Sequence, residues 1–266
     1  MLDVLKQQIS TLNSHTHKIN RTRELLQIII LYHLSNEWFF EHHCFIWWTA
    51  LRICHWLQRY SEDLDFSVKE HSTYNYLKII NTLEITLKQY GFEIENTVKE
   101  WAIFGWTIKF NHLLYDLWLS GHFDQKLQIK CEIDTEAPKW AERETKIINE
   151  LFIFPIHAHT LPSLFAWKVH AILQRWFTKG RDRFDLVWYL TKRVTPNYFL
   201  LNNALKQTES DLIINDRNTL STLLTHKLWE FTTQDLLNDV GVFLQSDDQR
   251  KLMDVELIRA LIWKSK

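Results

Sequence analysis

The most informative stretch of the chain is RYSEDLDF, residues 59–66. If these residues form a β-strand, Asp63 and Asp65 project from the same face, while Leu64 and Phe66 point into a core. Two carboxylates held close together repel each other unless a cation lies between them. Hard oxygen ligands suit Mg²⁺ better than zinc. The stretch therefore predicts a strand with a magnesium site, and a solvated acidic strand face is the alternative.

The segments around this stretch predict an α/β unit. The apolar segment 43–46 and the alternating segment 63–68 favour strands, with a helix over 49–57 between them. A helix over 74–90 follows, with Gly91 as its C-terminal cap. Further alternation predicts strands, antiparallel because their connections are short, at 92–98, 103–110 and 127–134.

Both ends of the chain have helical patterns. Residues 1–34 carry apolar residues at helical spacing, as do the segments 163–176, 181–193, 196–207, 219–231 and 249–262. The sequence therefore predicts an α+β protein with two domains. Residues 1–160 would form an α/β domain with N-terminal helices, and residues 161–266 an all-helical domain.

The composition of the chain bears on its contacts with RNA and membranes and on its compartment in the cell. The 31 basic and 32 acidic residues give a net charge of −1, so any RNA contact must come from a local cluster. The three cysteines form no CxxC pair, which favours a reducing compartment, and we expect a cytoplasmic protein. The apolar run 25–31 is far shorter than the roughly 20 residues that a spanning helix needs, so we expect no membrane contact.

Several segments together resemble a known family. Residues 45–53, FIWWTALRI, precede the acidic stretch. The two stretches resemble the AbiEii family of toxin nucleotidyltransferases, in which a Gly-Gly-Thr-x-Leu-Arg turn precedes an Arg-aromatic-Ser-x-Asp-Leu-Asp strand. Residues 161–171 and 179–186 are similar to the family's later Lys and Arg-Asp segments. The resemblance extends over roughly residues 35–245, and the family belongs to the polymerase-β-like nucleotidyltransferase superfamily.

This resemblance implies a fold and an activity. The fold would be a mixed β-sheet nucleotidyltransferase core followed by an all-helical C-terminal half. The activity would be Mg²⁺-dependent transfer of a nucleotide from an NTP to a hydroxyl acceptor, tRNA or another RNA, with two metal ions at the reacting phosphate. The protein would be the toxin of a type IV toxin–antitoxin system, with a cognate antitoxin protein as its partner.

The resemblance also implies roles for individual residues. Asp63 and Asp65 would bind the metal, Lys168 the triphosphate, and Asp182 would be a further essential acid. In this superfamily a third catalytic and metal-binding carboxylate usually comes from a neighbouring strand, for which we prefer Glu132, with Asp134 second. The alternative is that both are ordinary charges at a strand edge.

The nucleotide is expected near the turn and the cationic helix. The residues predicted to bind it are Trp47, Trp48, Thr49, Arg52, Ser61, Lys168 and Arg175. Lys168 and Arg175 are seven residues apart on a predicted helix and so share one face, which could hold phosphates; the alternative is a solvated Lys and Arg. Asp182 and Asp185 also fit the first turn of a helix, where an acid favours the helix dipole.

One departure from the family pattern is sharp, because Trp47 and Trp48 stand where the family has two glycines. A glycine turn lets the backbone approach phosphates, whereas two indoles would fill that space. The chain has 5 glycines and 13 tryptophans. An average chain has roughly 7% Gly, about 18 residues at this length, which the two counts reach together.

We hypothesise that many of these tryptophans are UGA codons translated as Trp, although the source organism reads UGA as glycine. The same exchange is expected at Trp167, Trp56, Trp118 and Trp140, whereas Trp188 has the pattern of a genuine helical aromatic residue. If the residues are truly Trp, the alternative function is a catalytically dead pseudoenzyme or binding module. A metal-dependent nuclease that uses the same acids is a second alternative.

Overall fold

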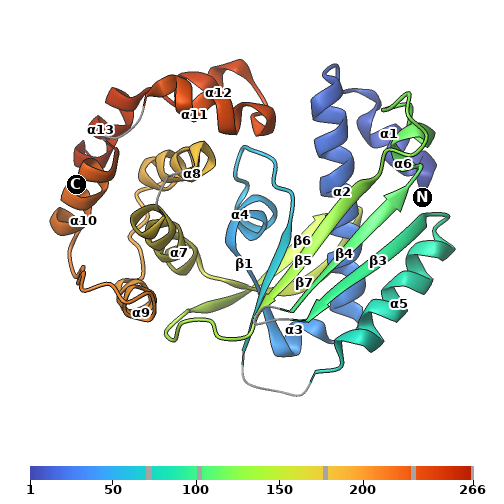
Figure 1. Ribbon diagram of the computed structural model, residues 1–266, viewed down its shortest axis with the longest axis horizontal. Helices are drawn as coiled ribbons and strands as arrows, with labels where there is room; N and C mark the ends of the chain where they lie inside the picture. The colour runs from blue at the N-terminus through green and yellow to red at the C-terminus, as the bar shows by residue number, and fades with distance from the viewer. Residues whose placement is uncertain (70–73, 101–103, 176–178, 229–231, 265–266) are drawn as a thin grey trace. The chain divides into compact units, whose positions relative to one another are not determined.

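The computed structural model describes residues 1–69, 74–100, 104–175, 179–228 and 232–264 (Figure 1). It divides into two compact units. The first comprises residues 1–54, 60–137 and 145–158, and the second comprises residues 55–59, 138–144 and 159–266. The predicted domains, 1–160 and 161–266, stay a prediction.

A seven-stranded mixed sheet forms the centre of the first unit. Its strand order is β3-β4-β5-β2-β1-β7-β6. The strands are β1 (His43–Ile46), β2 (Leu64–Val68), β3 (Glu93–Glu100), β4 (Phe104–Asn111), β5 (Leu127–Asp134), β6 (Arg143–Glu150) and β7 (Phe152–His159).

Strand β2 lies in the middle of this sheet. It pairs antiparallel with β1 and parallel with β5, while β3, β4 and β5 form an antiparallel meander. The first four residues of β2 are buried. Phe66 stacks on Trp106 of β4, with 6.5 Å between ring centroids, and both side chains belong to the core.

Helices cover the sheet of this unit. α2 packs against β5 and α5, and α5 packs along β3 (Figure 1). The Ser14 side chain caps α2, and the Asn75 side chain caps α5. The helices of the first unit are α1 (Leu2–Ser10), α2 (His15–Asn36), α3 (Phe39–His42), α4 (Trp47–His55), α5 (Tyr76–Gln89) and α6 (Leu113–Asp116).

The second unit is mainly helical. α7 packs against α8, α9 and α10, while α8 also contacts α11 and α13. The elements are α7 (Leu161–Gln174), α8 (Gly180–Thr191), α9 (Tyr198–Gln207), α10 (Arg217–Leu228), α11 (Thr233–Val240), the 3₁₀ turn η1 (Gly241–Phe243), α12 (Asp247–Lys251) and α13 (Val255–Lys264).

The predicted α+β fold is confirmed, with a mixed sheet followed by helices. The strands predicted at 43–46 and 127–134 have the predicted bounds, whereas β2 begins at Leu64, one residue later than predicted. Strands β6 and β7 and helix α11 were not predicted. Residue 103 of one predicted strand, and residues 176 and 229–231 of two predicted helices, lie outside the described residues.

Candidate functional site

Three acidic residues come together in the first unit. Asp65 in β2 pairs in register with Glu132 in β5, and Asp63 lies directly before β2 begins. Parallel strands in register place Asp65 and Glu132 side by side on one face of the sheet. Asp134 pairs with Ser67, two positions further along, and its side chain accepts a hydrogen bond from the Glu136 amide at 2.9 Å. The register therefore favours Glu132 over Asp134.

Asp65 is the electrostatically unusual member of this acidic cluster, which we define as Asp63, Asp65 and Glu132. Its side chain is buried. Burial raises the pKa of Asp65 well above its ordinary value, and the charges of Asp63 and Glu132 raise it further, while Lys130 acts in the opposite direction. Within the described residues, no basic side chain forms an ion pair with Asp65. A cation would therefore relieve a real excess of negative charge.

The fit of a metal ion to the acidic cluster is partial. Glu132 forms an ion pair with Lys130 at 2.6 Å. In the described part of the chain, no group of three or more His, Cys, Asp or Glu side chains is arranged to hold a metal ion. Asp63 and Asp65 fit a hard divalent cation, which prefers carboxylate oxygens. Glu132 would complete the set if one of its two carboxylate oxygens faced the same ion.

The loop that carries Asp63 is held by buried polar side chains. The Thr49 hydroxyl of α4 lies 2.8 Å from the Ser61 hydroxyl and also contacts the Asp63 carbonyl. Gln27 of α2 donates to the carbonyls of Ser61 and Glu62, at 3.2 and 2.8 Å. Thr49 and Ser61 are both buried, so in this geometry they position the loop.

The Gln27 contact was missed at the level of sequence, although it left a signal. Gln27 interrupts an otherwise apolar helical run, and its side chain is nevertheless buried. Buried amides need hydrogen-bond partners. A lone polar residue in an apolar helix face therefore points to a buried polar contact.

Arg52 is engaged with α2. Its Nε lies 2.5 Å from Glu24, and Glu24 also pairs with Arg21 at 2.7 Å. The Arg52 guanidinium lies 5.1 Å from the ring centroid of Tyr60. Its predicted contact with a nucleotide stays a prediction.

The two tryptophans of the turn lie at the start of α4. Trp47 and Trp48 stack with 6.0 Å between ring centroids, and Trp47 has a φ of 60°. They follow Ile46, the last residue of β1, which pairs with Asp65. The turn thus follows directly from the strand position opposite Asp65.

Lys168 belongs to a buried ion network in the second unit. Its ammonium lies 2.7 Å from Asp182 and 2.6 Å from Asp185, and none of the Lys168 residue is exposed. Arg59 binds both carboxylate oxygens of Asp185 at 2.7 Å, and Arg175 binds Asp182 at 2.6 Å. Helix α7 and the start of α8 are thereby tied together.

This network changes how the predicted residues are understood. Lys168 and Arg175 do come together, since both bind Asp182, but the ammonium of Lys168 is enclosed by carboxylates. Arg175 keeps 36% of its side chain exposed. Asp185, considered at the sequence level only as a helix-start acid, is fully buried and binds two cations. The contact of Lys168 with a triphosphate stays a prediction.

Asp182 should make stability depend on acid pH. Burial would raise its pKa, but Lys168 and Arg175 outweigh burial and hold the pKa below the ordinary 3.8. Its contribution is therefore fully present above about pH 4 and is lost as pH falls through the lowered pKa. We expect Asp182→Asn to reduce the free energy of unfolding by about 1.5–3 kcal/mol at pH 7. Urea titrations should show this difference shrinking below pH 4, and a constant difference would contradict the assignment.

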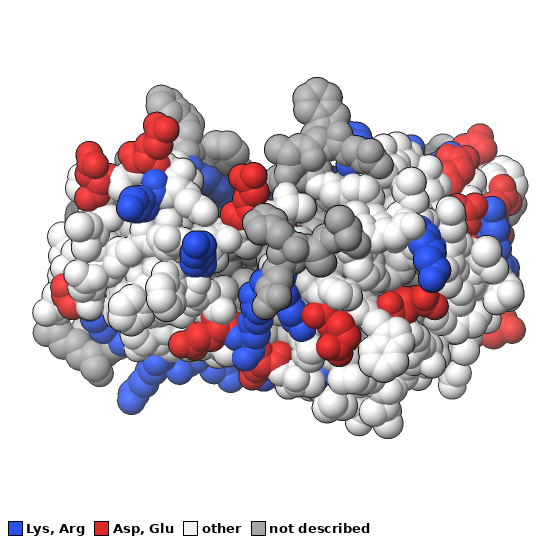
Figure 2. Space-filling view, turned by 90° about the horizontal axis from the view of Figure 1, so that it is seen from below, with Lys and Arg blue, Asp and Glu red and all other residues white. Residues whose placement is uncertain are grey.

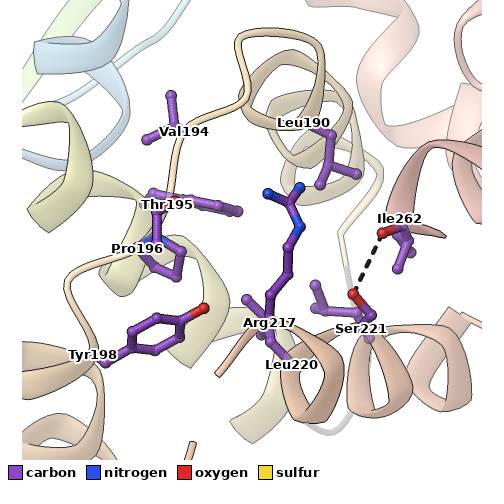
Figure 3. A pocket seen from close by; sticks show the side chains of 11 residues that line it. Leu190, Val194, Thr195, Pro196, Tyr198, Arg217, Leu220, Ser221 and Ile262 are labelled. Carbon is purple, nitrogen blue, oxygen red and sulfur yellow. Dashed lines mark hydrogen bonds between the residues drawn. The ribbon is translucent and has the colours of Figure 1, made fainter. Parts of the chain in front are cut away.

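A pocket among the helices of the second unit is too small for a nucleotide. Figure 3 shows its lining, with the Arg217 side chain reaching between Leu190 and Pro196. Its volume is about 10 Å³, the space of roughly one water molecule. The Ser221 hydroxyl beside it donates to the Ile262 carbonyl at 3.3 Å.

Charge is mixed on the face shown in Figure 2, where described Lys and Arg side chains lie among Asp and Glu side chains. This agrees with the near-zero net charge of the sequence. None of the described helices has the length and apolar character needed to cross a membrane.

The mixed sheet followed by helices is a nucleotidyltransferase-type fold. Two solved structures from Helicobacter pylori share this fold. JHP933 is 16% identical, with 91% of each chain covered and a TM-score of 0.57. A second protein, assigned as a nucleotidyltransferase, is 15% identical, with 91% of this chain and 97% of the other covered and a TM-score of 0.54.

A family comparison goes further than the fold. Residues 49–255 match the model of the nucleotidyl transferase AbiEii toxin of type IV toxin–antitoxin systems, so the chain belongs to this family. No curated protein sequence matches the chain. The family resemblance drawn from the sequence is confirmed.

Proposed function

We propose that the protein transfers a nucleotide from an NTP to a hydroxyl of an RNA, with tRNA as the expected acceptor. The observation that carries this proposal is the buried Asp65 beside Asp63 and Glu132, with its raised pKa. Membership of a nucleotidyltransferase family supports the reaction class. The acceptor and the NTP follow from the family resemblance alone.

The proposed reaction has a simple balance. The RNA hydroxyl loses its proton to water and its oxygen forms a bond to the α-phosphorus, while the bond between the α-phosphorus and the bridging oxygen breaks and pyrophosphate leaves. When bound, Mg²⁺ would lower the pKa of the attacking hydroxyl and stabilise the leaving charge. Asp63 and Asp65 are the proposed ligands, with Glu132 as the third. Thr49 and Ser61 hold the loop that positions Asp63.

The proposal also covers residues of the second unit, a protein partner and the location of the protein in the cell. Lys168, Asp182 and Arg175 are proposed to be required for activity, and their shared contacts support a role in holding α7 and α8 in place. A cognate antitoxin is the proposed protein partner, since the family consists of toxins of type IV toxin–antitoxin systems. The cytoplasm is the proposed location, in keeping with three free cysteines.

A single assay separates this function from its rivals. Labelled NTPs and total tRNA are incubated with Mg²⁺ and with the Trp47→Gly/Trp48→Gly variant, in parallel with the chain as written. Labelled RNA of increased length supports transfer. RNA shortened without NTP would replace the proposal with a nuclease, and a variant that neither binds NTP with Mg²⁺ nor alters RNA would leave a binding module.

We expect Mg²⁺ to raise the melting temperature through the acidic cluster. At a concentration about 100 times its Kd, a ligand of the native state stabilises by about 2.7 kcal/mol. Asp65→Asn should remove this increment, and should itself raise the melting temperature without metal, because the buried charge repulsion is lost. Differential scanning calorimetry measures both effects.

Asp124→Asn is the matched control, because Asp124 is exposed and lies in a turn outside the strands that carry the cluster. It should keep the full response to Mg²⁺. An identical Mg²⁺ response in Asp65→Asn would place the metal elsewhere.

A further inference from the structure

We infer that the cell makes glycine at positions 38, 47, 56, 118 and 140, where the translated sequence has tryptophan. All five residues have a left-handed backbone. Their φ angles are 58° at Trp38, 60° at Trp47, 64° at Trp56, 57° at Trp118 and 78° at Trp140. In this conformation the Cβ atom of an L-residue crowds the following carbonyl, and glycine alone escapes that cost.

Tryptophan dominates this conformation in the chain. Of the nine non-glycine residues with positive φ in the described part of the chain, five are Trp, whereas Gly91 is the one glycine. A positive φ is a rare outlier for a bulky residue. The backbone conformation at these five positions is thus the one normally found at glycine.

The end of α6 shows most directly that a tryptophan occupies a glycine position. Trp118 donates its amide to the Tyr115 carbonyl at 2.9 Å, and Leu119 donates to the Leu114 carbonyl at 2.7 Å. This pair of bonds is the Schellman motif, whose left-handed residue is usually glycine. Trp118 occupies that residue's place.

The chain contains the same motif with a true glycine. At the end of α5, Gly91 donates to the Lys88 carbonyl at 2.9 Å, and Phe92 donates to the Leu87 carbonyl at 3.2 Å. Gly91 has a φ of 87°. Residues 91 and 118 are thus structurally equivalent helix ends.

The apolar character of their exposed side chains separates these tryptophans from two other left-handed residues. Arg193 and Glu209 follow α8 and α9 with positive φ, but their charged side chains belong in water. Trp38, Trp56 and Trp118 are 74%, 80% and 85% exposed, so their indoles gain little from burial to offset the strained backbone.

A single base change explains how a glycine codon can be translated as tryptophan. The codons GGA and UGA differ by one base, and glycine at the five positions would raise the glycine count from 5 to 10, closer to the roughly 7% Gly of an average chain. An organism that reads UGA as glycine would place glycine at these positions. Translating the same gene with a code in which UGA means tryptophan gives tryptophan instead.

The inference stops at these five positions. Trp48, Trp167 and Trp188 lie inside α4, α7 and α8 without positive φ, so their backbones do not demand glycine. Two open hollows, of about 450 and 340 Å³, have Trp118 and Trp38 in their walls. Loss of those indoles would remove a wall from each hollow, so we assign no ligand to either.

The first test reads the gene and the natural protein. We expect TGA at codons 38, 47, 56, 118 and 140, and glycine at these positions in peptides from the protein isolated from its own cells. TGG at these codons overturns the inference, and so does tryptophan in the peptides.

The second test measures how much glycine, compared with alanine, stabilises the left-handed backbone at position 118. Trp118→Gly should melt about 2–4 °C above Trp118→Ala, because alanine removes the indole but keeps the Cβ atom. Gly91→Ala should lower the melting temperature by a similar amount, and Trp188→Gly should lower it because glycine weakens a helix interior. Equal melting temperatures for Trp118→Gly and Trp118→Ala would count against glycine at this position.

Discussion

Asp65→Asn is expected to reduce nucleotide transfer by about 10³-fold or more, since the loss of several kcal/mol of metal-dependent stabilisation changes a rate by this factor. The side chain keeps its size but can no longer supply a charged oxygen ligand in the buried cluster. Transfer of label from NTP to RNA measures the effect, with Trp47→Gly/Trp48→Gly as the background chain.

The control for this prediction is Asp124→Asn in the same background, which should keep full activity because Asp124 is exposed. Circular dichroism should give the same folded signal for both variants. If Asp65→Asn transferred nucleotide at the rate of the control, the acidic cluster would not be the metal site.

Lys168→Met should lower the free energy of unfolding by about 3–5 kcal/mol, the usual effect of removing one partner from a buried ion pair. The substitution takes away the cation that lies 2.7 Å from Asp182 and 2.6 Å from Asp185. Both carboxylates are buried, so water cannot replace the lost charge. Urea denaturation at neutral pH measures the change.

An exposed lysine provides the comparison. Lys251 pairs with Asp248 on the surface, where 80% of its side chain is exposed, so Lys251→Met should leave stability nearly unchanged. Combining Lys168→Met with Asp182→Asn should cost less than the two changes cost separately, because the residues share one network. A Lys168→Met protein as stable as Lys251→Met would contradict the buried network.

The acidic strand could be predicted because its signal is local. Alternation in residues 63–68 places charged and apolar side chains on opposite faces. The alternating segment 127–134 likewise predicted the bounds of β5. The pairing of Glu132 with Asp65 was a choice between two acids two positions apart, and only the register of β2 against β5 separates them. A strand pattern in one segment does not specify its partner's register.

Other features left weak or misleading signals. β6 and β7 were missed because β6 is half exposed and β7 contains Pro155, which disfavours a strand. One of the two partners of Asp185 is Arg59, which is distant in sequence and was quoted only as part of the acidic stretch. The burial of Lys168, which was predicted to bind the triphosphate, could not be predicted because spacing along a helix does not reveal which face is buried.

The pairing of β2 with β5 has a consequence for biosynthesis. A ribosome that has made residues 1–100 has produced Asp63 and Asp65 but neither Glu132 nor the strand that carries it. Contacts between distant segments form late, after the intervening chain has emerged. A nascent or prematurely terminated chain therefore lacks the complete acidic cluster, on which the proposed nucleotide transfer depends.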